Sequence, residues 1–161
     1  MKLLGKIIIA ILAFALSYLL VLFVINRLAT GSEESAFTHT VSRVIDGDTV
    51  EMADGSKVRL AGIDTPEKGE CGFDEARLAL EALVLDKKVA LIPAGETDAD
   101  RYGRLIRYVD FEKGEGFSDD AGFLLIEKGL AKARYDSRDG YGEHKRQDIY
   151  VFTDAAVEDK C

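Results

Sequence analysis

The sequence predicts an α+β protein, a small barrel of five β-strands with three helices, preceded by one transmembrane helix. Three observations lead to this prediction. Five short apolar runs have the length of strands, three further segments have helical spacing, and a long uncharged run lies near the N-terminus. With 161 residues, the chain has room for one domain of ordinary size and an appendage.

Residues 1–27 are predicted to form a membrane anchor or an uncleaved signal. Within them, residues 7–25 are uncharged and almost wholly apolar, and as a helix they would extend about 28 Å, enough to cross the hydrocarbon core of a bilayer. Lys2 and Lys6 precede this run, which favours a single-pass protein of the cell membrane with its C-terminal domain outside the cytoplasm. The alternative is a signal peptide cleaved near residues 29–31, followed by secretion.

The charge balance argues against simple electrostatic attraction to nucleic acids. All 29 acidic residues lie after Arg27, and with the 18 of the 21 basic residues that also follow it they give that part of the chain a net charge of −11. Nonspecific binding to nucleic acid normally draws on a basic surface. A polyanionic partner would therefore have to be held locally, or through a bound cation.

Residues 28–38 are small and polar, as in a tether, and the folded domain is expected over residues 39–161. Its strands are predicted at residues 39–45, 48–53, 57–63, 88–93 and 104–110. Asp54-Gly55 supplies the hairpin turn between the second and third strands. A closed or partly open barrel of the five-stranded oligonucleotide-binding (OB) type fits this number of strands.

Three helices complete the predicted domain, with loops at residues 112–117 and 136–145. The helices are expected from Asp74 to about Asp86, from Ser118 or Asp119 to Gly129, and around residues 149–156. The first of them falls after the third strand, so the predicted order is three strands, a helix, two strands and two helices.

Acidic residues gather at the ends of two predicted strands. Asp46 and Asp48 flank Gly47, and Asp64 and Glu67 follow the third strand. Each group by itself is typical of a turn or a strand end. Two carboxylates about 4 Å apart repel by roughly 4 kcal/mol at an effective dielectric near 20, so a fold that brings them together favours a cation between them.

The other candidate residues also have plain structural interpretations when each is taken alone. Arg59 and Arg104 are compatible with surface positions on strands, and Tyr102 with a half-buried position in the barrel. Cys71 and Cys161 are the two cysteines of the chain. In an exported protein they can form a disulfide that closes a loop of about 90 residues, and two unpaired thiols are the alternative.

Four short motifs follow one another in an order and at a spacing that resembles the staphylococcal nuclease (thermonuclease) family. They are Ile45–Thr49, Arg59–Glu67, Asp100–Arg104 and Gly129–Ala133. Each motif alone is weak, but the series is specific, and the resemblance covers about residues 39–157. It implies a five-stranded barrel with three helices that hydrolyses phosphodiester bonds in DNA and RNA with the help of calcium.

The resemblance also implies a metal site and a general base. Asp48, Asp64 and the backbone carbonyl of Thr65 would bind Ca²⁺, and Asp46 would contact the metal through water. Such a set suits Ca²⁺, which takes oxygen ligands in flexible geometry. Glu67 would orient or deprotonate the attacking water, a role worth about 10² to 10⁴ in rate.

The remaining matches imply contacts to the substrate. Arg59 and Arg104 would hold the phosphate and stabilise its developing charge, because the guanidinium fork fits phosphate oxygens bidentately. Tyr102, with Arg101 beside it, would contact a terminal phosphate, and Tyr135 would lie under a nucleotide base. Arg101 replaces the lysine of the family's best-known member, which changes the donor geometry and keeps the charge.

The sequence therefore predicts a membrane-tethered, calcium-dependent nuclease that acts on DNA or RNA as a monomer. Its acidic domain departs from the basic character expected of such a nuclease, and lower affinity with stronger dependence on salt and calcium is the expected result. The alternative is a catalytically weak module of the same fold that binds nucleic acid or protein. A cell-surface adhesion domain would not need the cluster of acids and arginines.

Overall fold

The computed structural model describes residues 17–18, 20–21, 37–114 and 117–160. The chain divides into two compact units, residues 1–35 and residues 36–161. The second unit contains every strand of the described chain.

The predicted membrane helix falls almost entirely outside the described residues. Of the run at 7–25, only Ser17, Tyr18, Leu20 and Val21 are described, and these four are helical. Nowhere in the described ranges is there a helix long and apolar enough to span a membrane. Both the anchor and most of the tether therefore stay predictions.

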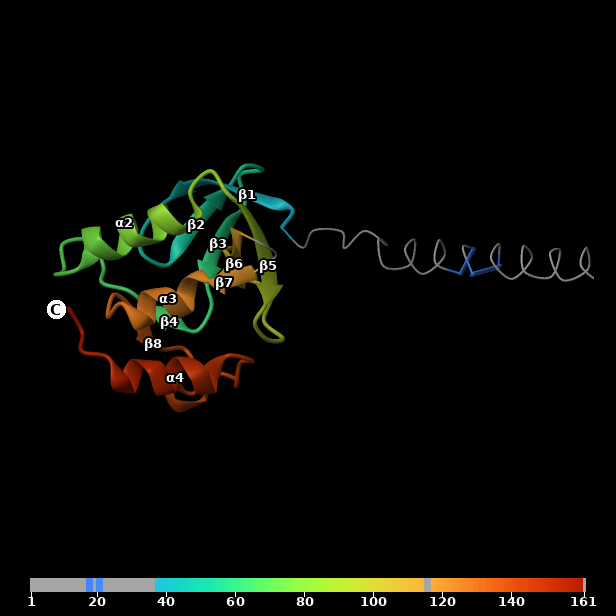
Figure 1. Cartoon of the computed structure of the whole chain (residues 1–161). Helices are drawn as coiled ribbons and strands as arrows, with labels where there is room; N and C mark the ends of the chain where they lie inside the picture. Colours follow the sequence, from blue (N-terminus) through green and yellow to red (C-terminus); the bar gives the residue numbers. More distant parts are fainter. Residues whose placement is uncertain (1–16, 19, 22–36, 115–116, 161) are drawn as a thin grey trace, which may run out of the picture. The chain divides into compact units, whose positions relative to one another are not determined.

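Five strands close into a barrel, as the sequence predicts (Figure 1). They are β1 (His39–Val44), β2 (Thr49–Met52), β3 (Lys57–Leu60), β5 (Lys88–Pro93) and β6 (Leu105–Gly114). Antiparallel neighbours run in the order β3-β2-β1-β5-β6, and parallel pairing of β3 with β6 closes the circle. β7 (Phe117–Asp120) extends the sheet beyond β6, and β4 (Ile63–Asp64) pairs with β8 (Lys132–Ala133) in a separate sheet.

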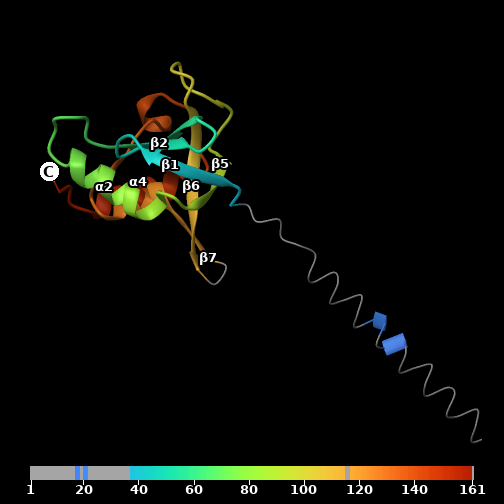
Figure 2. The ribbon, with the colours of Figure 1, turned by 90° about the horizontal axis from the view of Figure 1, so that it is seen from above.

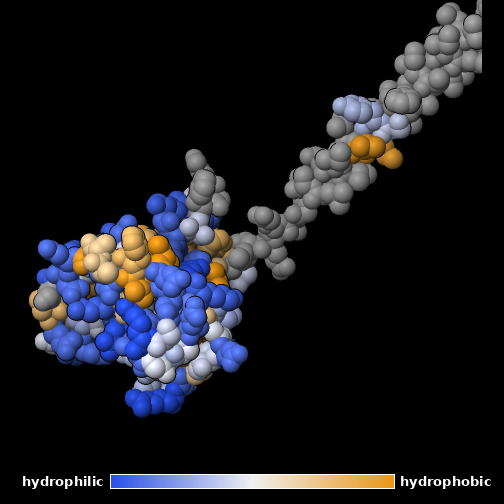
Figure 3. Space-filling model, turned by 90° about the horizontal axis from the view of Figure 1, so that it is seen from below, coloured by the Kyte–Doolittle hydropathy of each residue, from blue (hydrophilic) through white to orange (hydrophobic). Residues whose placement is uncertain are grey.

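Three helices pack against the barrel, α2 (Phe73–Val84), α3 (Ala121–Glu127) and α4 (Gln147–Ala156). Figures 1 and 2 show them on one side of the strands, and α3 contacts both of the others. A 3₁₀ turn, η1 (Ser137–Asp139), interrupts the predicted loop before α4. Figure 3 shows hydrophobic side chains gathered on the face that carries α4, where Ile149 and Phe152 are exposed.

The core forms where the inward faces of the strands meet the helices. The helical spacing of the sequence predicts Ala76, Leu80, Leu83 and Val84 on the inner face of α2. Three of them, Ala76, Leu80 and Val84, are fully buried, and Leu83 is partly buried. Val50 and Val58, which are directly paired across β2 and β3, are also fully buried. Burial of a valine or leucine side chain stabilises the fold by about 1.5 to 3 kcal/mol. The alternation of apolar and polar residues along the strands therefore favours the closed barrel.

The third predicted strand is two strands in the structure, because the chain turns at Gly62. Gly62 has a φ of +74°, in the left-handed region that favours glycine. A β-carbon at this position would lie 2.5 Å from the imidazole of His144. The backbone therefore leaves β3 after Leu60 and starts β4 at Ile63, which was not apparent from the apolar run.

Helix starts and the β6–β7 hairpin also differ from the prediction. Asp120, and neither Ser118 nor Asp119, is the N-cap of α3, since its side chain accepts hydrogen bonds from two backbone N–H groups of the first turn. α2 begins after Gly72, with Asp74 in its first turn. The predicted loop at 112–117 is largely hairpin strand, and its residues 115–116 lie outside the described residues.

A polar network joins the segment before α4 to the barrel. The Tyr108 hydroxyl lies 2.8 Å from Nδ1 of His144 and accepts a hydrogen bond from the backbone N–H of Arg146 at 3.1 Å. The guanidinium of Arg146 donates to both carboxylate oxygens of Asp110, at 2.6 and 2.8 Å. Burial lowers the pKa of His144, so the imidazole favours its neutral form in this position.

Gly47 allows the turn between β1 and β2 to pack against the rest of the site. A β-carbon at this position would lie 2.7 Å from Oγ1 of Thr65 and 2.8 Å from the β-carbon of Ala76. Those distances leave no room for a side chain. The glycine of the Asp-Gly-Asp sequence is therefore needed for close packing as well as for turn formation.

Replacing Gly47 by Ala should lower the free energy of unfolding by about 1 to 3 kcal/mol, because the added methyl group overpacks Thr65 and Ala76. Urea unfolding followed by circular dichroism measures the change. Gly95→Ala is the matched control, because nothing lies within 4 Å of a β-carbon there, and it should change stability by no more than about 0.5 kcal/mol. Equal effects of the two substitutions would contradict the packing described here.

Candidate active site

Strand pairing brings the first acidic cluster to Arg59. Thr49, the first residue of β2, lies directly opposite Arg59 in β3. The backbone N–H of Leu60 donates to the carbonyl of Asp48 at 2.7 Å. Asp48 is therefore held beside Arg59 by the register of the barrel.

Arg59 lies between the two carboxylates that the sequence places at neighbouring strand ends. Its guanidinium forms an ion pair with Asp48 and a second one with Asp64 at 3.3 Å. The side chain of Arg59 is only 14% exposed, so the surface position considered from the sequence is wrong. In this structure the cation between Asp48 and Asp64 is a side chain of the protein itself.

The electrostatics of Arg59 follow from this position. Burial lowers its pKa, but the charge of Asp48 and a hydrogen bond to it raise the pKa by more, so the guanidinium stays charged. Nη1 of Arg59 is buried and is the atom that forms the ion pair with Asp48.

Asp48 is fixed by several further hydrogen bonds. One carboxylate oxygen accepts from the backbone N–H of Thr65 at 3.3 Å and from its hydroxyl at 3.2 Å, and the other accepts from the hydroxyl of Thr49 at 3.0 Å. Asp46 accepts from the backbone N–H of Asp48 at 3.1 Å. Burial, followed by the charge of Asp48, raises the pKa of Asp46. The two acidic clusters are thus joined through Asp48 and Thr65.

Arg104 reaches the same cluster through Thr49. Its Nη1 donates to the Thr49 hydroxyl at 3.2 Å, and its Nε donates to Asp100 at 2.7 Å. Asp100 also accepts from the backbone N–H groups of Tyr102 and Arg104, at 2.9 and 3.0 Å, which fixes the turn before β6. Sequence reasoning gave no role to Thr49 or Asp100, although both lie inside the recognised motifs.

Tyr135 contacts the site, in a different way from the base stacking implied by the resemblance. Its hydroxyl donates to Asp64 at 3.0 Å, and the guanidinium carbon of Arg59 lies 5.0 Å from the centre of its ring. Tyr102 is 70% exposed, so the half-buried position considered for it is wrong. Arg101 lies 5.0 Å from the ring of Tyr102, which places both at the surface beside Arg104.

Glu67 is not in contact with the two clustered aspartates. It lies exposed in the loop after Pro66, and its backbone N–H donates to the side chain of Glu70 at 2.7 Å. Within the described part of the chain its carboxylate forms no hydrogen bond or ion pair, and no group of three His, Cys, Asp or Glu side chains could hold a metal ion. Its role as general base stays a prediction.

The oxygen atoms present fit Ca²⁺ in their chemistry. Asp48 and Asp64 already converge on one cationic group, and Thr65, which directly follows Asp64, donates a hydrogen bond to Asp48. Two carboxylates, a carbonyl and waters form a suitable set for this ion. Because Arg59 contacts both carboxylates, Ca²⁺ bound to them would compete with Arg59.

Cys71 is disulfide-bonded in the structure. Cys161 lies outside the described residues, so the pairing of these two cysteines stays a prediction. A disulfide at Cys71 is typical of a protein in an oxidising compartment.

The comparison with known families is decisive. A family model described as "Staphylococcal nuclease homologue" matches residues 57–161, more than half of the chain. The chain belongs to the staphylococcal nuclease homologue family. This match confirms the family that the motifs resemble, and with it the five-stranded barrel with three helices; it includes all of the motifs except Ile45–Thr49.

Several relatives of this family member carry nuclease names. It is 30% identical to the micrococcal nuclease of Shigella flexneri over 124 residues, 72% of this chain and 67% of the relative. It is 35% identical to the thermonuclease of Staphylococcus hyicus over 107 residues, covering 61% and 60% of the two chains. It is 31% identical to an uncharacterized endonuclease of Haemophilus influenzae over 118 residues, covering 71% and 58%. The chain thus spans about two thirds or less of the length of these relatives.

Replacing Asp48 by Asn should lower the free energy of unfolding by about 3 kcal/mol, because Arg59 then stays largely buried without its main counter-charge. Combining Asp48→Asn with Arg59→Gln should cost less than the sum of the single changes, with a coupling of about 1 to 3 kcal/mol. Urea unfolding with chelator present measures this cycle. The exposed pair Arg43–Glu51 is the control and should couple by less than about 1 kcal/mol. Additive effects of the Asp48 and Arg59 changes would refute the ion pair.

Proposed function

We propose that this protein is a calcium-dependent nuclease that hydrolyses phosphodiester bonds in DNA, RNA or both. The observation that carries the proposal is the convergence of Asp48, Asp64 and Arg59, with Arg104 tied to the same point through Thr49. Membership of the family and the nuclease names of the relatives support it.

Four residues are assigned to the metal. Asp48, Asp64 and the backbone carbonyl of Thr65 bind Ca²⁺, and Asp46 contacts it through water. When bound, Ca²⁺ supplies positive charge that neutralises the phosphate oxygens as negative charge develops on them.

Two arginines are assigned to the scissile phosphate. Arg59 turns its largely buried guanidinium from the aspartates to the phosphate oxygens, and Arg104 approaches the phosphate from the turn before β6. Both supply charged donors where the transition state gains negative charge. Arg101 and Tyr102, exposed beside Arg104, contact the next phosphate of the substrate.

Glu67 is assigned the proton transfer. Its loop begins directly after Asp64-Thr65-Pro66, and its carboxylate is exposed and has no partner among the described residues. It is therefore free to accept a proton from the attacking water. Tyr135 positions Asp64 and Arg59 through its hydroxyl and its ring, and lies close enough to the site to meet a nucleotide base as well.

The proposed location is the outer side of the cell membrane. The apolar run at residues 7–25 would anchor a monomer in the membrane, or would direct secretion if it were cleaved. The disulfide at Cys71 supports an oxidising compartment. The net negative charge of the domain makes the affinity for nucleic acid low and dependent on Ca²⁺.

A binding module of the same fold is the second candidate. The full chain, purified in detergent, should cut denatured DNA in Ca²⁺ and fail to cut it in chelator. Glu67→Gln and Arg104→Ala should each lower the rate by about 10² or more. Glu112→Gln and Arg43→Ala, at exposed positions away from the site, are the matched controls and should leave the rate unchanged.

Two outcomes would contradict these assignments. If Glu67→Gln and Arg104→Ala cut DNA as fast as the wild type, the roles given to these residues are wrong. If the wild type binds DNA in Ca²⁺ without cutting it, the protein is a binding module.

A further inference from the structure

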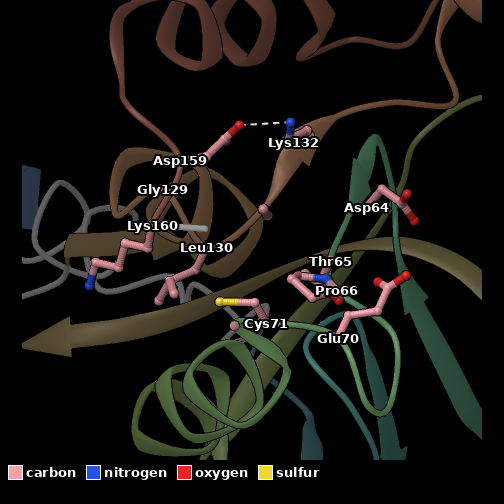
Figure 4. Close-up of a pocket in the computed structure, with 12 residues that line it drawn as sticks. Asp64, Thr65, Pro66, Glu70, Cys71, Gly129, Leu130, Lys132, Asp159 and Lys160 are labelled. Atoms are coloured by element: carbon pink, nitrogen blue, oxygen red, sulfur yellow. Dashed lines mark ion pairs between the residues drawn. The ribbon is translucent and has the colours of Figure 1, made fainter.

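A pocket of about 340 Å³ adjoins the proposed active site and shares Asp64 and Thr65 with it. Asp64 and Thr65 belong to both, so whatever enters this pocket lies next to the scissile phosphate. Figure 4 shows the other walls, a loop that carries Glu70 and Cys71, the segment of Leu130 and Lys132, and the end of the chain with Asp159 and Lys160. We call this space the tail pocket.

The end of the chain is fixed in place as a wall of the tail pocket. The backbone N–H of Lys160 donates to the carbonyl of Gly129 at 3.1 Å, and Lys132 forms an ion pair with Asp159 at 2.7 Å (Figure 4). A β-carbon on Gly129 would lie 2.4 Å from the carbonyl oxygen of Glu158, so the two segments touch backbone to backbone. The tail pocket is therefore a built feature of the fold.

The chemistry of the lining selects the kind of group that can enter. Asp64, Glu70 and Asp159 surround the space, and the ammonium of Lys132 is already paired with Asp159. A phosphate inside would meet these carboxylates and be repelled. Leu130, Ala131 and Pro66 supply an apolar surface, and the backbone around them supplies polar groups, so a neutral ring with polar edges fits.

We propose that the tail pocket receives the sugar and base of the nucleotide on one side of the scissile phosphate, with Lys160 beside the phosphate that follows. This inference rests on the proposed function, because the scissile phosphate is placed at Arg59. Sugars and bases alternate with phosphates along a strand. If the pocket beside the scissile phosphate holds a neutral sugar and base, the next phosphate lies beyond the pocket, where a second cation would bind it. Lys160 is that cation, since its side chain extends away from Asp64 at the far side of the pocket (Figure 4).

The lining also predicts how the base is recognised. None of the residues that line the tail pocket is aromatic, so the base is held by shape and backbone groups without stacking on a side chain. Stacking on aromatic rings commonly gives sequence-tolerant affinity to proteins that bind single strands. The tail pocket instead fixes the position of the base. It accepts only an unpaired nucleotide, because a base held there cannot remain in a duplex.

Photo-crosslinking locates the base directly. The probe is a single-stranded tetrathymidylate with one 4-thiothymidine, placed at each position in turn and bound to the full chain carrying Glu67→Gln. Mass spectrometry of the irradiated complex should find crosslinks at Leu130, Lys132 or Lys160 from probes modified on one side of the central phosphate only. Crosslinks to other parts of the protein from every probe would overturn the inference.

Binding affinity tests the role of Lys160. Lys160→Glu should raise the Kd of a fluorescein-labelled tetrathymidylate about tenfold, measured by anisotropy in the same Glu67→Gln background. Lys145→Glu makes the same charge change at an exposed position outside the pocket and should raise it less than about twofold. Equal effects of the two substitutions would overturn the inference. Both measurements report binding, so a protein that binds as described but does not cut would refute only the proposed hydrolysis.

Discussion

The ion pairs of Arg59 with Asp48 and Asp64 are the interaction on which the site depends. The two carboxylates would repel each other without a cation between them, and a largely buried guanidinium without a counter-charge would destabilise the fold. The carboxylates and the guanidinium therefore stabilise one another. The same three groups are those proposed to hold the metal and the phosphate. In the structure, the charged groups proposed to bind metal and phosphate therefore neutralise one another within the chain.

The barrel makes this arrangement possible through register and close packing. Thr49 lies opposite Arg59, and its hydroxyl links Asp48 to Arg104, so three strands contribute to one point. Gly47 lets the first turn pack directly against Thr65. The loop of Glu67 and part of the tail pocket consist of irregular backbone next to these strands. Loops held by a scaffold commonly carry binding and catalytic residues.

Much of the fold could be predicted from local patterns, and what was missed depends on tertiary contacts. Alternating apolar residues located the five barrel strands, and the spacing of Ala76, Leu80 and Val84 located the inner face of α2. The break at Gly62 is next to His144, which is distant in the sequence, so no local pattern could reveal it. The motifs supplied the residues proposed for the site, but the burial of Arg59 between two aspartates follows only from the pairing of β2 with β3 and from the turn at Gly62 that leads into β4.

Calorimetric titration of Ca²⁺ into the full chain and into the Arg59→Gln variant tests the central claim most directly. If Arg59 neutralises the carboxylates proposed to bind the metal, its removal should tighten Ca²⁺ binding by about tenfold or more. The guanidinium then no longer competes with Ca²⁺ for the two carboxylates. The same variant should cut DNA more slowly. Unchanged or weaker Ca²⁺ binding by Arg59→Gln would contradict the account.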